Sequence, residues 1–164
     1  MLPAKAHITL EQGEAAAGAP YKIVLRVPHG CEGSATTKID VKLPEGIIAA
    51  KPMPKAGWEI AIKNGAFARS YAFYHGITLK DGAREISWSG GKLPDEYYDE
   101  FVIAAFVARE LAPGPLYFRV KQTCEKGEAD WAETPSADRD VHSPKFPAPM
   151  LNVIEPHDHH EHKH

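Results

Sequence analysis

The stretch Thr37-Lys38-Ile39-Asp40-Val41-Lys42-Leu43 alternates polar and apolar residues from Lys38 onward. Successive side chains of a β-strand point to opposite faces, so this pattern places Ile39, Val41 and Leu43 together on one face. On a helix, apolar residues at every second position would point in several directions and share no face. The stretch therefore predicts a strand with one side in a hydrophobic core.

The same period of two recurs on both sides of this stretch. Tyr21–Val27 alternates and ends at Pro28. Trp58–Ile62 alternates before the dipeptide Asn64-Gly65, which predicts a hairpin turn into a strand over residues 67–74. Further strands are predicted over residues 84–88, 101–107 and 116–123, with weaker candidates over residues 129–131 and 151–154. With no capped helical period, the chain predicts a single β-sandwich of roughly seven to nine strands.

The composition is that of one ordinary globular domain. The chain has 164 residues, of which 43% are hydrophobic and 25% are charged, enough to build a core and unlike a disordered protein. A formal net charge of -3 provides no attraction for nucleic acid or an anionic membrane. No apolar run approaches the roughly 20 residues that a bilayer span requires. We therefore expect neither a nucleic-acid partner nor a membrane span.

The N-terminus carries a processing signal. Ala4 and Ala6 have the small-x-small spacing that signal peptidase reads. We interpret residues 1–6 as the remnant of a secretory signal, although Ala-Lys-Ala also arises by chance in an alanine-rich chain. Cleavage after Ala6 would make His7 the first residue of a periplasmic or otherwise extracytoplasmic protein, with its domain over residues 7–154.

Cys31 and Cys124 are the only cysteines, and neither belongs to a Cys-x-x-Cys pair. A metal site made of cysteines alone is therefore disfavoured. Two distant cysteines in an exported protein predict one disulfide bond. The alternative is a pair of buried free thiols.

A histidine at the start of a chain offers two nitrogen donors, the α-amine and the ring Nδ1. Such a chelate suits Cu(II), which is at the top of the Irving–Williams order, and the metal displaces the amine proton. Glu14 follows a turn at Gly13 and offers a carboxylate to the same ion. The alternative interpretation is that His7 is a solvated strand-edge residue and Glu14 an ordinary surface residue.

A second feature is the segment Gln122–Glu133, which is typical of a hairpin with Trp131 on its outgoing arm. An indole N–H only donates hydrogen bonds and cannot ligate a metal. A role for Trp131 in covering an open face of the metal site and excluding water rests only on the family resemblance given below. The alternative is that Trp131 is a core aromatic residue with no functional role.

The C-terminus is rich in histidine, with five of the nine histidines in its last eight residues. These are His157, His159, His160, His162 and His164. Tracts of this kind bind divalent metal loosely. We interpret residues 155–164 as an auxiliary metal-binding tail. An engineered tag is the less favoured alternative because the tract is not a run of six histidines.

In their order along the chain, several motifs resemble the YcnI-like copper-binding domain family, long classed as a domain of unknown function. The resemblance covers about residues 7–154. The motifs are Ala6–Leu10, Glu14 with Gly18, Arg26–Pro28, Ile86–Pro94, Tyr98–Phe101 and Gln122–Trp131.

The resemblance implies an immunoglobulin-like β-sandwich, all-β and a single domain. It also implies a copper brace built on one histidine, with the amine and ring of His7, the carboxylate of Glu14, and Trp131 beside them. Here Met1–Ala6 precede His7, so its nitrogen is an amide and the brace forms only after cleavage.

These features favour an extracytoplasmic Cu(II)-binding protein that acts as a metallochaperone or copper buffer. We do not expect it to be an enzyme. Its expected partners are the copper ion and another periplasmic copper chaperone or a membrane copper transporter. One alternative is a copper-dependent oxidase resembling the polysaccharide monooxygenases, which need a second brace histidine. His29, His75 and His142 are the candidates, each in a turn or tail. Another alternative is a metal-free adhesion sandwich, against which the terminal histidine and the histidine tail argue.

Overall fold

The computed structural model describes residues 6–135 and 144–156. Within them, twelve strands and a single 3-10 turn, η1 (Tyr74–Gly76), make up the regular structure. The strands are β1 Thr9–Leu10, β2 Glu14–Ala16, β3 Pro20–Val27, β4 Thr36–Lys42, β5 Ile47–Pro52, β6 Glu59–Ala72, β7 Thr78–Leu93, β8 Asp99–Val107, β9 Gly114–Tyr117, β10 Arg119–Cys124, β11 Glu128–Trp131 and β12 Met150–Ile154. The all-β prediction is confirmed. No helix of the described residues has the length and apolarity to cross a membrane.

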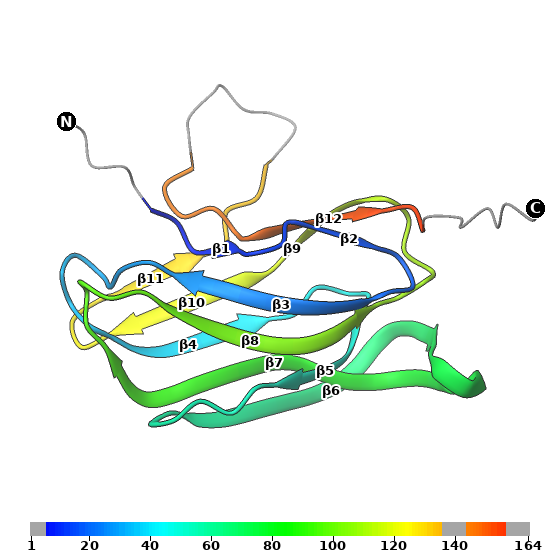
Figure 1. Ribbon diagram of the computed structural model, residues 1–164, viewed down its shortest axis with the longest axis horizontal. Coiled ribbons are helices and arrows are strands. Elements are labelled where there is room, and N and C mark those ends of the chain that lie inside the picture. Colours follow the sequence, from blue (N-terminus) through cyan, green and yellow to red (C-terminus); the bar gives the residue numbers. More distant parts are fainter. Residues whose placement is uncertain (1–5, 136–143, 157–164) are drawn as a thin grey trace, which may run out of the picture.

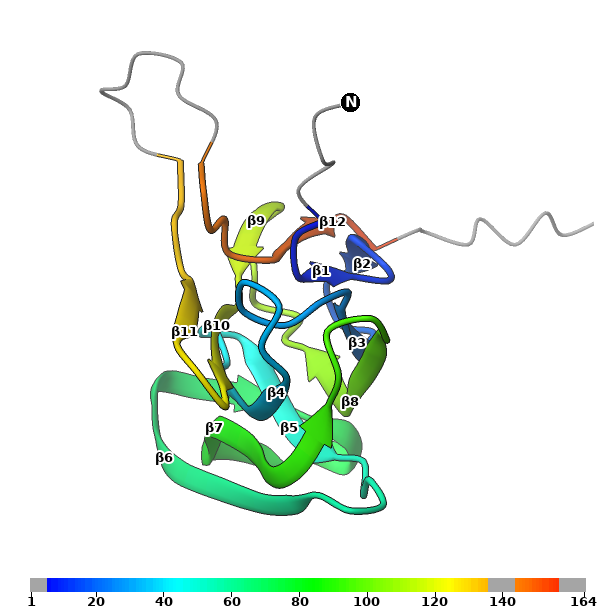
Figure 2. The same ribbon diagram turned by 90° about the vertical axis from the view of Figure 1, so that its left-hand side faces the viewer.

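The strands form three sheets, with the orders β1-β3-β8-β5, β11-β10-β4-β7-β6 and β2-β12-β9. The first two sheets face each other across the core, as Figure 1 shows from the side. Seen along the long axis in Figure 2, the small third sheet lies over one open side of this sandwich. The chain therefore has two main layers with an added short sheet, the arrangement of an immunoglobulin-like fold.

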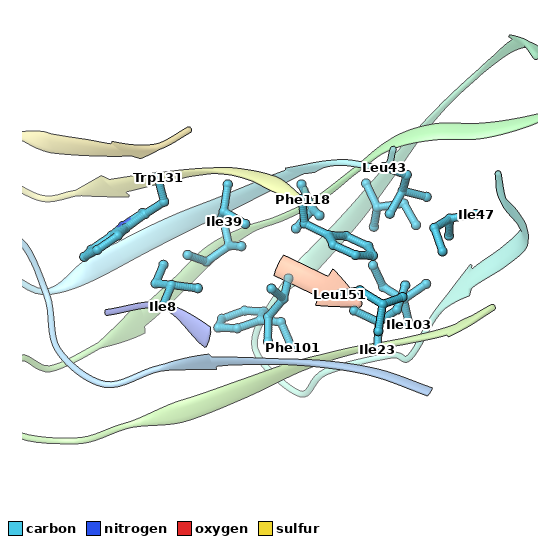
Figure 3. Packing of buried hydrophobic residues seen from close by; sticks show 14 of the residues in the cluster. Ile8, Ile23, Ile39, Leu43, Ile47, Phe101, Ile103, Phe118, Trp131 and Leu151 are labelled. Carbon is cyan, nitrogen blue, oxygen red and sulfur yellow. The ribbon is translucent and has the colours of Figure 1, made fainter. Parts of the chain in front are cut away.

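The hydrophobic core contains the apolar side chains of the strands that alternate in sequence. Ile39, Val41 and Leu43 are all buried, and each such side chain contributes roughly 1.5–3 kcal/mol of stability on leaving water. Figure 3 shows Ile39 and Leu43 between the sheets, with Ile8 and Trp131 at one end of the same cluster. Burial of Ile8 attaches the start of the chain to the core.

The predicted hairpin turn at Asn64-Gly65 is wrong. β6 runs through both residues and pairs with β7, with a register shift between Lys63 and Asn64. Neither residue has the positive φ that a two-residue turn of this kind requires. The dipeptide lies at a β-bulge instead, where one strand accommodates an extra residue. The chain reverses at η1, where His75 has a φ of 57°.

The number of strands exceeds the seven to nine predicted because several are short or divided. The segment predicted over residues 116–123 breaks at the buried Phe118 into β9, which pairs with β12, and β10, which pairs with β4 and β11. β1 and β2 are two and three residues long, too short to show a period. β5, with the sequence Ile-Ile-Ala-Ala-Lys-Pro, has no alternation.

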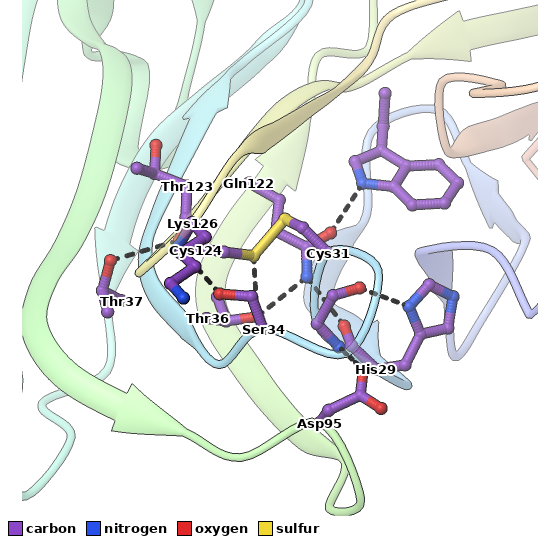
Figure 4. The surroundings of a disulfide bond; sticks show 12 residues. His29, Cys31, Ser34, Thr36, Thr37, Asp95, Gln122, Thr123, Cys124 and Lys126 are labelled. Carbon is purple, nitrogen blue, oxygen red and sulfur yellow. Dashed lines mark hydrogen bonds between the residues drawn. A yellow bond between two sulfur atoms is a disulfide. The ribbon is translucent and has the colours of Figure 1, made fainter.

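The predicted disulfide bond between Cys31 and Cys124 is confirmed. It joins the loop that follows β3 to the last residue of β10. Because β10 forms a hairpin with β11, this bond draws the loop after β3 toward the strand that ends at Trp131. The surroundings of the bond are shown in Figure 4.

Candidate metal centre

His7 is half-buried and lies two residues before β1, with the buried Ile8 next to it. β1 is held on β3 by the pair Thr9 and Arg26. The centre of the His7 ring lies 5.8 Å from that of Trp131, with the planes tilted by 56°. The structure thus brings together two of the three residues that the sequence analysis assigned to a metal site.

Trp131 is both a core residue and a wall of this site. It is 2% exposed, and its indole packs at right angles on Phe146 with ring centres 5.2 Å apart. Its Nε1 donates a hydrogen bond to Oε1 of Gln122 at 3.0 Å. Because the only polar atom of the indole is engaged, Trp131 offers His7 an apolar ring and no metal ligand.

Gln122 connects this indole to the loop that follows β3. Its side chain is fully buried, and its Nε2 donates to the carbonyl of His29 at 2.7 Å and to Oγ1 of Thr36 at 2.8 Å. An indole N–H can only donate, so the amide oxygen of Gln122 must face Trp131 and its nitrogen must face the loop. Figure 4 shows Gln122 between the indole and the loop.

His29 is one of the three histidines that the sequence analysis named as candidates for a second brace histidine. Its ring centre lies 6.4 Å from that of Trp131. Its Nδ1 is 2.6 Å from the carbonyl oxygen of Gly30, and its Nε2 is 2.7 Å from the carbonyl oxygen of Ala6. A signal for this placement existed in the sequence, because Cys31 stands two residues after His29 and pairs with a cysteine in the hairpin of Trp131.

The loop that carries His29 is tightly built. The N–H of Gly30 donates to Oδ1 of Asp95 at 2.9 Å, and the backbones of Cys31 and Ser34 exchange two hydrogen bonds. A Cβ atom on Gly30 would lie 1.8 Å from the carbonyl oxygen of Ser34, so only glycine fits there. The position of His29 is therefore fixed on both sides, by Gln122 through its carbonyl and by Gly30 through the close contact.

Glu14, the third predicted ligand, is exposed at the start of β2 and aligned with Asn152 in β12. β1 and β2 follow one another along one edge of the sandwich (Figure 1), and seven residues of extended chain span up to about 23 Å. No hydrogen bond or ion pair joins the Glu14 carboxylate to His7 in the described residues. Glu14 and the two imidazoles therefore form no group of three metal-binding side chains in the described residues.

Of the other histidines, only His75 lies within the described residues. His75 is exposed in η1, beside Tyr74. His142 and the five tail histidines, His157, His159, His160, His162 and His164, lie outside the described residues.

Side chains alone do not complete a metal site here. Within residues 6–135 and 144–156, no group of three or more His, Cys, Asp and Glu side chains could hold a metal ion. The two imidazoles beside Trp131 need a further donor that is not a side chain. A free amine on His7 is such a donor, and with the two rings it would form an all-nitrogen set that fits copper.

Comparison of folds supports the architecture. An uncharacterized protein from Nocardia farcinica, whose crystal structure reveals an immunoglobulin-like fold, is 24% identical to this chain and superposes with a TM-score of 0.66, over 90% of this chain and 97% of that one. A type I cohesin from Pseudobacteroides cellulosolvens is 10% identical over 96% of this chain and 97% of that one, with a TM-score of 0.47. The likeness to the cohesin is too distant to show more.

No curated protein matches the chain. A protein-family model described as Domain of unknown function (DUF1775) matches residues 7–153. The match begins at His7 and includes Trp131 and both cysteines of the disulfide bond. Because it covers most of the sequence, the chain belongs to the DUF1775 family, which is the YcnI-like family that its motifs resemble.

Proposed function

We propose that this chain, cut between Ala6 and His7, is an extracytoplasmic protein that binds Cu(II) at its new N-terminus. The observation that carries the proposal is the placement of His7 against the buried indole of Trp131, with ring centres 5.8 Å apart. A terminal residue is usually free to move. Here the buried neighbour Ile8 holds His7 beside an apolar wall.

Copper chemistry accounts for the need for cleavage. An amide nitrogen is a poor ligand, whereas a terminal amine and the Nδ1 of the same histidine chelate one ion. Trp131 would cover one face of that ion and restrict access of water, an effect of the surroundings that tunes a metal site. Residues 6 and 7 are both described, and the bond between them lies at an exposed position.

An extracytoplasmic location is supported by two features. Ala4 and Ala6 have the spacing that signal peptidase reads. The disulfide bond between Cys31 and Cys124 is of the kind that persists in oxidising compartments.

The proposed role is copper trafficking or buffering, as a metallochaperone. Two surface cavities of about 570 and 470 Å³ are present, and neither is lined by His7, His29 or Trp131. A half-buried His7 at the surface suits exchange of the ion with another protein, such as a periplasmic copper chaperone or a membrane copper transporter. The histidine tail would serve as a capture arm.

The test compares chains that begin at Met1 and at His7. Both end at Pro156, so that the tail is removed while every described strand is kept. In competition titrations, the chain beginning at His7 is expected to bind one Cu(II) at least about tenfold more tightly, the smallest loss expected when a metal site is disturbed. His7→Ala in the shorter chain is expected to remove the site. Equal affinity of the two chains would refute a site at the terminal amine.

A copper-dependent oxidase is the second candidate, and one observation favours it. A second imidazole, that of His29, lies beside the same indole as His7. Peroxide production by the copper-loaded chain with ascorbate separates the two functions. A metallochaperone is expected to produce no more peroxide than the His7→Ala variant, whereas an oxidase would produce a clear excess.

A further inference from the structure

We infer that His29 is a second imidazole ligand of the copper ion, through Nε2, in the chain that begins at His7. This inference rests on the proposed function and adds a residue to its site. The sequence resemblance implied a brace with one histidine and Glu14. The structure places His29 next to the terminal residue, with its Nε2 at the carbonyl of Ala6.

The first argument is the state of the His29 ring. Its Nδ1 lies 2.6 Å from the carbonyl oxygen of Gly30. A carbonyl oxygen only accepts hydrogen bonds, so Nδ1 must carry the proton in this bond. Histidines that bind metals almost always donate their other ring N–H to a carbonyl or carboxylate in this way. Nε2 faces a carbonyl too, that of Ala6. Once that carbonyl is removed by cleavage, the neutral ring with its proton on Nδ1 has a free lone pair on Nε2.

The second argument is the position of Nε2. It lies 2.7 Å from the carbonyl oxygen of Ala6. That oxygen and the nitrogen of His7 belong to one amide group and are roughly 2.3 Å apart. Nε2 of His29 is therefore within about 5 Å of the future amine. Two nitrogen ligands of one ion, each bonded at about 2 Å, are about 4 Å apart or less.

Cleavage would change what Nε2 faces. In the uncut chain, the Ala6 carbonyl occupies the hydrogen-bonding position of Nε2. When the bond after Ala6 is cut, this carbonyl leaves with residues 1–6 and the amine of His7 stays. The same event that creates the first ligand thus uncovers the second.

The third argument is that His29 is already held in place. Its carbonyl accepts a hydrogen bond from the buried Gln122, which also holds Trp131. The disulfide bond at Cys31 fastens the same loop two residues later. A ligand that is ordered before the metal arrives loses little entropy on binding, which increases affinity. Three nitrogen donors without a carboxylate also favour copper over Mg²⁺ and Ca²⁺, which prefer oxygen.

The experiment uses the chain from His7 to Pro156, which lacks the tail histidines, with half an equivalent of Cu(II), so that the tightest site fills first. The variants are His29→Gln, His7→Ala, Glu14→Ala and the matched control His75→Gln, which changes an exposed histidine in η1. Electron spin echo modulation counts the imidazoles bound to Cu(II), and competition titration gives the affinity. Thermal unfolding checks that each variant is folded.

We expect two bound imidazoles in the parent chain, in His75→Gln and in Glu14→Ala. His29→Gln is expected to show one imidazole and an affinity at least about tenfold lower. One imidazole in the parent chain, or an unchanged signal in His29→Gln, would overturn the role of His29. The terminal copper site would still stand in that case, provided that His7→Ala abolishes copper binding. A signal and affinity unchanged in His7→Ala would instead overturn the proposed function itself.

Discussion

The two ends of the sandwich are stabilised by different interactions. β8 begins at Asp99, opposite Val27 just before the His29 loop, and its Phe106 lies opposite Pro20 at the other end. At the first end, a disulfide bond and the buried amide of Gln122 hold the structure together. At the second, an apolar cluster does so; its members are Ile48, Phe67, Tyr71, Phe106 and Ala108.

The contrast shows what each kind of interaction can specify. Apolar packing is not directional and stabilises a fold in proportion to the area buried. A hydrogen-bonded network with a covalent link specifies the orientation of particular carbonyls and rings. The first end can therefore position His29 and Trp131 for a ligand. Changes at the second end should affect stability alone, and changes at the first should affect stability and copper binding together.

The largest effect is expected from removing the disulfide bond with Cys31→Ser and Cys124→Ser together. The cysteines are 93 residues apart, and opening a loop of this size costs about 4–5 kcal/mol in the chain-entropy model. Urea unfolding of the chain beginning at His7 measures this loss. Copper affinity should fall too, because the His29 loop loses its anchor. A stability loss with unchanged copper affinity would show that Gln122 alone positions the loop.

The second prediction concerns the apolar end. Phe106 is 3% exposed and packs edge-on against Phe73 and Tyr74. Phe106→Ala is expected to cost about 3–5 kcal/mol because it leaves a cavity. Copper affinity of the folded variant should stay as in the parent chain. If affinity fell in step with stability, the two ends would not be independent.

A third, smaller effect is expected from Gln122→Leu, which keeps a similar volume. It leaves the buried Trp131 N–H, the His29 carbonyl and Thr36 without this partner. Only the Trp131 N–H is then a buried group with no other partner in the described residues, because Thr36 keeps its contact with Sγ of Cys124 and the bond at the His29 carbonyl is only part-buried. The expected cost is therefore that of one unsatisfied buried group, about 1–3 kcal/mol. This variant should lose less stability than Phe106→Ala and more copper affinity, as calorimetric unfolding and competition titration would measure. The reverse order would contradict a positioning role for Gln122.

The smallest effect is a pH dependence at the apolar end. Burial, then the hydrogen bond that Tyr71 donates to Glu45, raise the pKa of Tyr71 to about 12 from its usual 10.0. A folded-state pKa above the unfolded one means that the stabilisation is complete below pH 10 and is lost as the pH rises through 12. Unfolding measured from pH 9 upward should therefore show Tyr71→Phe losing less stability than the parent chain. Parallel profiles would mean that Tyr71 does not contribute.

Most of the fold was predictable because its strands are amphipathic. Residues 38–43 alternate strictly and residues 21–27 do so apart from the buried Val24, and both correspond to strands with a buried face. The Asn64-Gly65 turn failed because a long two-stranded ribbon continues through that dipeptide as a bulge. Nothing in residues 59–72 alone distinguishes a turn from a bulge, since the partner strand decides between them.

The candidate site was predictable only where local patterns sufficed. His7 could be singled out by the cleavage pattern, and Trp131 only by the family resemblance. The proximity of His7 and Trp131 to His29 depends on pairing between separate segments, β1 with β3 for His7 and β10 with β11 for Trp131. The place of Glu14 depends on the chain passing from one sheet at β1 to another at β2, which a two-residue strand does not reveal.

The most direct test is a crystal structure of the copper-loaded chain that begins at His7, with the ion located by its anomalous scattering. We predict one copper ion beside Trp131, bonded to the amine and Nδ1 of His7 and to Nε2 of His29, while Nδ1 of His29 still faces the carbonyl of Gly30. A copper ion found elsewhere, with the amine of His7 unbound, would contradict a metal site at this end of the sandwich.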